Sequence, residues 1–598
     1  MGPAGSVLVV RATRPPRRAL YRDGLILNRV RNGLSGESVS ETPLAERIYA
    51  ACTRRPVLVL FLLCLALWLP GILSLPAMDR DEARFAQASK QMVETGNLVD
   101  IRFGTVPRYK KPIGIYWLQA ASTAVFGHGA LNAIWTYRVP SFLGGFVAVL
   151  LTFWLVRAIG PPSVAFAAAL LLALCLLLAV ESIIATTDAV LLATVVAGQG
   201  VLLRAYLAAR VPARAPPGLV LILIGWAAIG IGVLIKGPVT PVICLFTALL
   251  LSLWDRQWSW LSTLRPLRGL GVLLLLLLPW LIAIGIESHG AFFAQSLGHD
   301  FAGKLGTGQE SHGAPPGYYL ALSTITLWPA TLFLIPALVS AVRNRRDPAI
   351  RFLLVWAGLV WIAAELVPTK LPHYVLPAFP ALMALAALWF GAVKAPLSRA
   401  QRYLVGVAAV QFAVGMALIV AAPILAPRFY GHGPLPLWFV LAGLAGAVIG
   451  LVALLNACHR AFHPALTFTA AAAVLLYGVV TVGGAPRLDR LWVSEHAAAL
   501  VAHNARPGDP PPILIGYQEP SLVFLLGTHT RLPASGDAAA AAARNGGLAL
   551  VEERDRSGFL AHLSALGANA HALGQVSGLN YSRGKPVRIT LYRVKPAP

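Results

Sequence analysis

The sequence predicts a polytopic α-helical membrane protein. Hydrophobic residues make up 57% of the 598 residues, and charged residues make up only 12%. Apolar runs of roughly twenty residues, each long enough to cross a bilayer core of about 30 Å, recur between residues 56 and 482. The runs VLVLFLLCLALWLPGILSL and GLGVLLLLLLPWLIAIGI do not alternate apolar and polar residues, which excludes a transmembrane β-barrel.

We expect about thirteen spans, with the N-terminus inside and the C-terminus outside. Short loops on the inner side then carry most of the arginines, whereas the short outer loops carry little more than Lys236, Lys370 and Arg428. The net charge of +24 therefore indicates orientation in the membrane and excludes a nucleic-acid partner. The expected spans are residues 56–76, 138–156, 162–181, 188–207, 218–235, 238–254, 269–286, 317–341, 352–367, 373–393, 404–425, 436–457 and 464–482.

Three regions follow from this pattern. We expect a basic cytoplasmic tail without regular structure at 1–55, the membrane domain at 56–482 with outer loops at 77–137 and 287–316, and an outer α/β domain at 483–598. The last region should hold a helix at 492–505 and the strands PILIGY, LALVEE and VRITLYRV. The five cysteines lie in or beside the expected spans, so we expect no disulfide framework.

Charged residues cluster just after the first span, in AMDRDEARFAQ (77–87). Asp79 and Glu82 have the spacing of a helix-capping box, which accounts for both without a function. Asp81 is not needed for that box, and on a helix it shares one face with Arg84 and Phe85. A carboxylate on a partly apolar helix face at the membrane surface can act as a base or orient a sugar hydroxyl. We therefore single out Asp81 as a candidate catalytic residue.

A second cluster, VPRYKKPIGIYW, places Lys110 and Lys111 before a proline and an aromatic-rich helix. The lysines are either attracted to anionic head groups or form a cationic site for a phosphate at the start of that helix.

Asp188, in ESIIATTDAVLLA, is expected at the outer mouth of two spans, where it is either a helix N-cap or a site residue. Lys236 and Lys370 are either snorkelling residues or further site residues on the same side of the membrane.

The outer loop 287–316 is rich in glycine and contains His289, His299 and His312. The spacing of these histidines matches no compact zinc pattern, so the sequence does not support a divalent metal or any other cofactor.

Together, these motifs resemble a known family. DEARFAQASKQMVETGNLVDIRFGTVPRYKKPIGIYW, the outer aspartate, KGP, HGAPPGYY and KLPHYVLP are similar to segments of the ArnT-like polyprenyl-phosphate-sugar glycosyltransferases, which are GT-C enzymes related to protein O-mannosyltransferases. The resemblance implies an enzyme of the bacterial inner membrane with its active site on the periplasmic face. Its donor would be a polyprenyl-phosphate-linked sugar, and its acceptor lipid A or another surface glycan, reached by inverting displacement.

The resemblance also implies roles for particular residues. By motif match, Asp81 and Asp188 take the places of two outer aspartates, Arg84 that of an arginine, and Lys111 that of the lysine in the KP pair. Lys110 stands where the aminoarabinose transferases have an acidic residue that can contribute to a metal site, which suggests another sugar or acceptor. The full set is Asp81 and Asp188 as catalytic residues, Arg84, Lys111, Lys236 and Lys370 at the donor phosphate, and Asp79, Glu82, Phe85, Lys110, His312, Tyr318 and Tyr374 at the substrate.

Two alternatives stay open at this point. One is a protein O-mannosyltransferase-like enzyme. The other is a lipid-linked-sugar flippase or transporter, which predicts ionisable residues near the middle of spans and paired broken helices. Acidic residues at the outer ends of the expected spans favour surface chemistry over passage.

Overall fold

The computed structural model describes residues 44–296, 313–393, 397–431, 433–533, 540–541, 544 and 546–596. The elements below belong to one compact unit, Ala45–Pro598. Residues 1–43 of the expected tail lie outside the described residues. Residues 44–52 differ from the expectation of an irregular tail, because helix α2 (Leu44–Cys52) forms there. Its Tyr49 is buried, and the hydroxyl donates to the carbonyl of Ser163 at 2.8 Å, which anchors the helix.

The chain is a multi-pass membrane protein. Among the described residues, ten helices are long and apolar enough to cross a membrane, or eleven if one bent pair counts as a span. They are α3 (Pro56–Ser74), α6 (Ile134–Val156), α9 (Asp188–Ala208), α10 (Leu219–Lys236), α12 (Pro266–Glu287), α17 (Pro348–Leu366), η3 with α18 (Pro372–Ala392), α19 (Arg399–Tyr430), α20 (Leu437–Cys458) and α21 with its continuation (Phe462–Arg487).

Two expected spans are broken helices. The span expected at 162–181 is α7 (Pro162–Leu174) and α8 (Leu176–Ile183), bent by 61°, and the one expected at 317–341 is α15 (Tyr318–Thr326) and α16 (Thr331–Arg343). The two breaks contact each other, since the Leu176 amide donates to the carbonyl of Trp328 at 3.0 Å. Irregular backbone is tolerated at membrane depth where protein groups pair its polar atoms. Because α16 and α11 (Val239–Asp255) are shorter than a typical span, the count of about thirteen stays a prediction.

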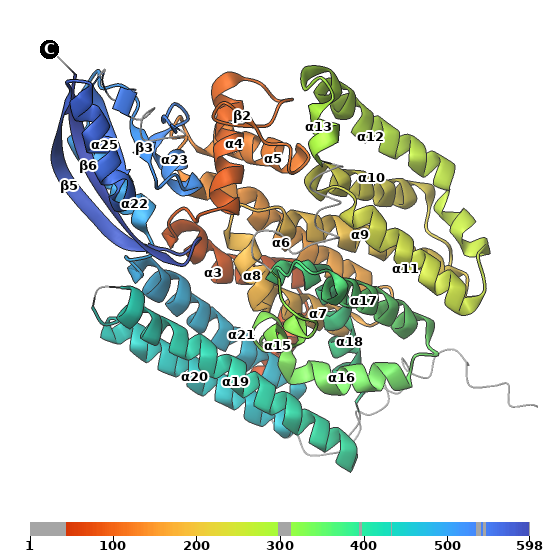
Figure 1. The fold of residues 1–598 in the computed structure, drawn as a ribbon. Helices are drawn as coiled ribbons and strands as arrows, with labels where there is room; N and C mark the ends of the chain where they lie inside the picture. Colours follow the sequence, from red (N-terminus) through yellow and green to blue (C-terminus); the bar gives the residue numbers. More distant parts are fainter. Residues whose placement is uncertain are drawn as a thin grey trace, which may run out of the picture. The chain divides into compact units, whose positions relative to one another are not determined.

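The segment expected as the first outer loop folds into α4 (Asp81–Thr95), a short hairpin of β1 (Arg102–Phe103) and β2 (Val106–Pro107), and α5 (Gly114–Phe126) (Figure 1). The predicted capping box is wrong: α4 begins at Asp81, Arg80 is at the N-cap position, and the helix start has no side-chain cap. Glu82 instead forms an ion pair of 2.8 Å with Arg138 of α6, and both side chains are buried. A buried carboxylate needs a charged partner more than a helix end needs a cap.

The C-terminal region contains a four-stranded sheet in the order β3-β4-β6-β5, with β3 (Ile513–Ile515) parallel to β4 (Gly547–Glu552) and the other pairs antiparallel. One face packs against α22 (Val493–Asn504) and α23 (Pro520–Leu526), and the other against α25 (Glu553–Ala565). The helix at 492–505 and the three predicted strands are confirmed, with β6 at Lys585–Lys595. The edge strand β5 (Asn569–Asn580) was not predicted, because its residues are mostly half-exposed and include two glycines. A domain boundary at 483 stays a prediction.

Candidate active site

A cavity of ≈ 300 Å³ lies where the loop before α5 meets the start of α9, the end of α10 and η3 (Pro372–Ala378). Five of the residues selected from the sequence line it: Lys110, Lys111, Asp188, Lys236 and Tyr374. They come from four segments that are far apart in the chain. Three ammonium groups around a cavity of this size are suited to an anionic ligand such as a phosphate.

Asp188 and Lys236 form a short ion pair in the wall of this cavity. The Nζ atom of Lys236 lies 2.6 Å from Oδ1 of Asp188, and the side chains are only 11% and 7% exposed. The N-cap interpretation of Asp188 is wrong, because Thr187 occupies the N-cap position and Asp188 is the first residue of α9. Lys236 is the last residue of α10 and is followed by Gly237 at φ +67°, a conformation that ends the helix there. The fold therefore brings two helix ends together as a buried charge pair.

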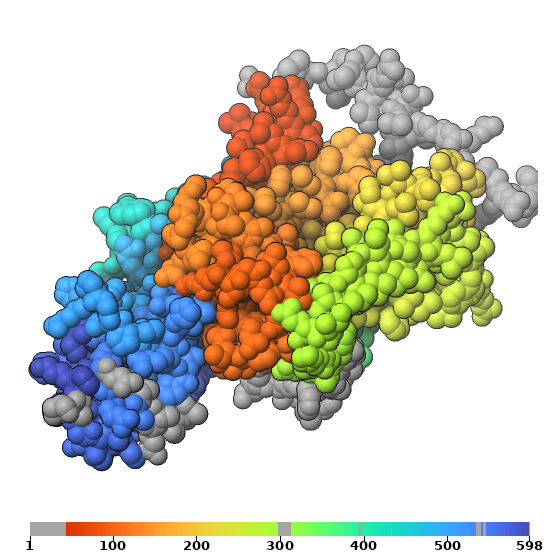
Figure 2. Space-filling model, turned by 90° about the horizontal axis from the view of Figure 1, so that it is seen from above, coloured from red at the N-terminus to blue at the C-terminus, as the bar shows by residue number. Residues whose placement is uncertain are grey.

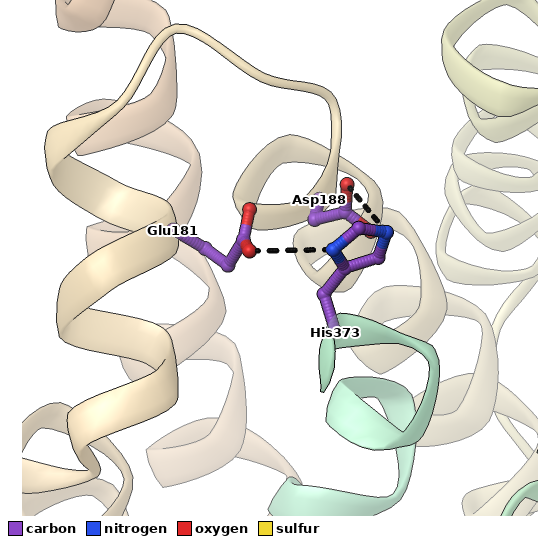
Figure 3. Close-up of side chains that lie close together, drawn as sticks. All are labelled: Glu181, Asp188 and His373. Carbon is purple, nitrogen blue, oxygen red and sulfur yellow. Dashed lines mark ion pairs between the residues drawn. The ribbon is translucent and has the colours of Figure 1, made fainter. Parts of the chain in front are cut away.

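His373 lies beside this pair, between Asp188 and a second carboxylate, that of Glu181 (Figure 3). Its Nδ1 atom lies 3.5 Å from Oε1 of Glu181, and its Nε2 atom lies 3.9 Å from Oδ2 of Asp188. The other oxygen of Glu181 accepts a hydrogen bond of 2.9 Å from the hydroxyl of Thr186. Sequence reasoning missed Glu181 and His373. The available signal was Glu181 itself, an acid inside an apolar run, since such residues are rare and usually have a role.

Glu181, Asp188 and His373 could also be considered as metal ligands, since one ligand atom from each lies within 4.8 Å of the others. The donor set fits a metal poorly. The two ring nitrogens of His373 face different carboxylates, and the ammonium of Lys236 already lies against Asp188. Lys236 already neutralises the Asp188 carboxylate, so this group is better suited to an ion-pair network than to a metal site.

Asp81 lies in a second group of residues around α4. It is the exposed first residue of the helix, whereas Arg84 is half-buried and Phe85 is buried. The guanidinium of Arg108 lies 5.2 Å from the centroid of the Phe85 ring. Burial raises the pKa of the Tyr116 hydroxyl, Arg108 lowers it, and the Asp81 carboxylate raises it. Asp81, Arg108 and Tyr116 therefore influence one another, although the described residues that line the cavity do not include Asp81.

Several other predicted site residues have partners in the scaffold. Lys370 is buried, and its ammonium donates to the carbonyls of Ala364 and Glu365 at the end of α17, at 2.9 and 2.6 Å. Glu82 forms its ion pair with Arg138, and Asp79 accepts a hydrogen bond from the Ser521 amide.

One predicted residue lies elsewhere. Tyr318 begins α15, and its ring contacts that of Tyr319, with centroids 5.0 Å apart. His312 lies outside the described residues.

Sequence comparison finds two kinds of similarity, one to a family model and one to individual enzymes. Residues 53–291 match the dolichyl-phosphate-mannose-protein mannosyltransferase family. An undecaprenyl phosphate-alpha-4-amino-4-deoxy-L-arabinose arabinosyl transferase of Pseudomonas paraeruginosa is 30% identical over 323 residues, which is 52% of this chain and 53% of that protein. The corresponding enzyme of Edwardsiella ictaluri is 28% identical over 332 residues, or 55% of this chain and 58% of that protein. The matches thus span about half the length of these relatives.

Structural comparison covers more of the chain. The apo crystal structure of ArnT from Cupriavidus metallidurans has a TM-score of 0.71 at 18% identity, and covers 92% of this chain and 98% of that one. The structure of the same protein bound to undecaprenyl phosphate has a TM-score of 0.70 at 18% identity, and covers 90% and 97%. The chain therefore has the fold of these ArnT structures, and its resemblance to ArnT-like GT-C glycosyltransferases is confirmed.

Proposed function

We propose that this chain is an integral-membrane glycosyltransferase that moves a sugar from a polyprenyl-phosphate-linked donor to an acceptor at the periplasmic face of a bacterial inner membrane. The observation that carries the proposal is the cavity lined by Lys110, Lys111 and Lys236, in a fold shared with an ArnT bound to undecaprenyl phosphate. About thirteen spans and an outer C-terminal α/β domain are part of the same proposal. Lipid A or another envelope glycan is the proposed acceptor.

The proposed reaction is a direct inverting displacement. The acceptor oxygen forms a bond to the anomeric carbon as the bond from that carbon to the donor phosphate oxygen breaks. Lys111 and Lys236 would stabilise the departing phosphate, because preorganised cations in a partly buried cavity lower the cost of its developing charge. Lys236 can do so without leaving a bare ammonium in the resting protein, since Asp188 balances its charge.

Asp81 is the residue that we propose activates or orients the acceptor. Its carboxylate is exposed at the start of α4, where it could take a proton from an acceptor hydroxyl as the new bond forms. A phosphate acceptor is already ionised, and Asp81 would then orient the acceptor. We assign Glu82 and Lys370 to the scaffold in this proposal, because their charges are satisfied by Arg138 and by backbone carbonyls.

Sugar transfer by the purified chain in proteoliposomes supplied with polyprenyl-phosphate sugars tests this mechanism. We expect Lys111→Ala to lower kcat/KM about 100-fold, the usual effect of losing one group that stabilises a transition-state charge. Lys585→Ala, at the exposed start of β6, is the matched control and should leave transfer unchanged. Full activity of Lys111→Ala would contradict the assignment of the phosphate site.

The acceptor needs a separate experiment. Mass spectrometry of lipid A and surface glycans, from cells with and without the protein, should reveal a sugar that depends on it. The match of residues 53–291 to protein mannosyltransferases favours a protein acceptor as the second candidate, so glycopeptides from the same cells should be compared. Movement of lipid-linked sugar across the bilayer with no new glycosidic bond would favour a flippase instead.

A further inference from the structure

Residues 77–80 are the last part of the linker from α3 to α4 and lead directly into Asp81, and the C-terminal region contacts them. The Ala77 amide donates to Oε1 of Glu495 at 3.3 Å, and the Asp79 amide donates to the hydroxyl of Tyr581 at 2.6 Å. The guanidinium of Arg80 donates to the carbonyl of Ser582, also at 2.6 Å. These partners are more than 400 residues away in the chain, since Asp79 and Tyr581 alone are separated by 502 positions.

The side chain of Asp79 is held by the same region. Its Oδ1 atom accepts hydrogen bonds from the amide of Ser521, at 3.2 Å, and from the Ser521 hydroxyl. That hydroxyl lies 2.6 Å from the hydroxyl of Ser494, which in turn lies 3.0 Å from that of Tyr517. Helix α23, of which Ser521 is the second residue, also packs directly on α4. Figure 2 shows the surfaces of α4 and α5, in shades of orange, beside the blue C-terminal region.

Arg80 gives these contacts a further consequence. Its φ angle is +66°, in the left-handed region that non-glycine residues rarely adopt. Such a conformation persists only where surrounding contacts hold it. Here the contacts lie at the preceding residue, Asp79, and at Arg80 itself. The direction in which the chain enters α4, and so the place of Asp81, depends on them.

We propose that the C-terminal region is a positioning element for Asp81, acting through Ser521, Tyr581 and Ser582 on the 77–80 linker. The proposal rests on the proposed function for the role of Asp81 in transfer, but not for the contacts themselves. Loss of a contact should lower kcat and leave the KM for the lipid donor unchanged, because the cavity lysines lie on other elements.

Tyr581→Phe and Ser521→Ala each remove one hydroxyl that contacts Asp79 and keep most of the side chain. Tyr592→Phe is the matched control, since it removes a hydroxyl from the core of the same sheet, on β6. Amide hydrogen exchange of residues 77–84 in the full chain, in nanodiscs, measures the contact without reference to activity. Loss of a single hydrogen bond changes an opening equilibrium by a factor of about three to ten. We therefore expect the amides of residues 77–84 to exchange about three to ten times faster in the two variants and at an unchanged rate in the control.

The kinetic arm uses the same three variants in the transfer assay. A three- to tenfold lower kcat at constant donor KM in Tyr581→Phe and Ser521→Ala, but not in Tyr592→Phe, supports the positioning role. Unchanged exchange at 77–84 in both variants would overturn it, as would faster exchange with an unaltered kcat. If the wild-type chain transfers no sugar while exchange responds as expected, the proposed function fails and the structural contact stands.

Discussion

Replacing Lys236 by methionine would leave the carboxylate of Asp188 buried without its ammonium partner. At the observed Nζ–Oδ1 distance of 2.6 Å, the attraction between unit charges is ~6 kcal/mol for an effective dielectric constant of about 20. Removing one partner of a buried pair costs about 3–5 kcal/mol, since the remaining charge loses this attraction and stays desolvated. His373 lies 3.9 Å from the same carboxylate and remains a polar neighbour of it in the variant. We therefore expect a loss of about 3 kcal/mol in the free energy of unfolding.

The assay is SDS-induced unfolding in mixed micelles of the wild type, Lys236→Met, Asp188→Asn and the double variant. The double variant should be less destabilised than the sum of the two single variants, because it leaves no unpaired charge, and the cycle should give a coupling of about 3 kcal/mol. Additive losses would refute the reasoning, since they would mean that the pair contributes nothing as a pair.

Three further outcomes follow from the same structure. Arg138→Met should destabilise the chain by about 3–5 kcal/mol, because the Glu82 carboxylate is left buried, whereas Arg102→Met, which removes a partly exposed pair, should cost under about 1 kcal/mol in the same unfolding assay. Burial raises the pKa of Asp79 to about 6, so the folded state binds a proton that the unfolded chain releases between pH of about 4 and 6. The stability of the wild type relative to Asp79→Asn should therefore rise by up to about 3 kcal/mol as the pH falls through that window, and a constant difference in pH-dependent unfolding would contradict this. Because Lys236 already neutralises Asp188, treatment with a chelator should leave transfer unchanged, and a loss of activity restored by a divalent cation would contradict the ion-pair network.

The membrane helices could be predicted closely, but the breaks within them could not. Apolar runs mark the spans at 162–181 and 317–341 as continuous, because hydropathy does not register the path of the backbone. The break before Leu176 is stabilised by the carbonyl of Trp328, from the other broken helix. In the C-terminal region, the apolar strands were predictable, whereas β5 depends on its pairing with β6 along most of its length. A strand without an apolar pattern of its own has no local signal.

The sequence by itself determined the class of this protein and pointed to several residues that line the candidate cavity. Runs long and apolar enough for a bilayer have no other stable environment. Charged residues at the ends of these runs and between them stand out, and they include Lys111, Asp188 and Lys236, which line the cavity. Only the tertiary structure decided which charges face the cavity and which belong to the scaffold. Glu82 meets Arg138 across 56 positions, and Asp79 meets Ser521 across 442. A buried charge takes whichever partner the fold brings to it, and sequence spacing carries no record of that choice.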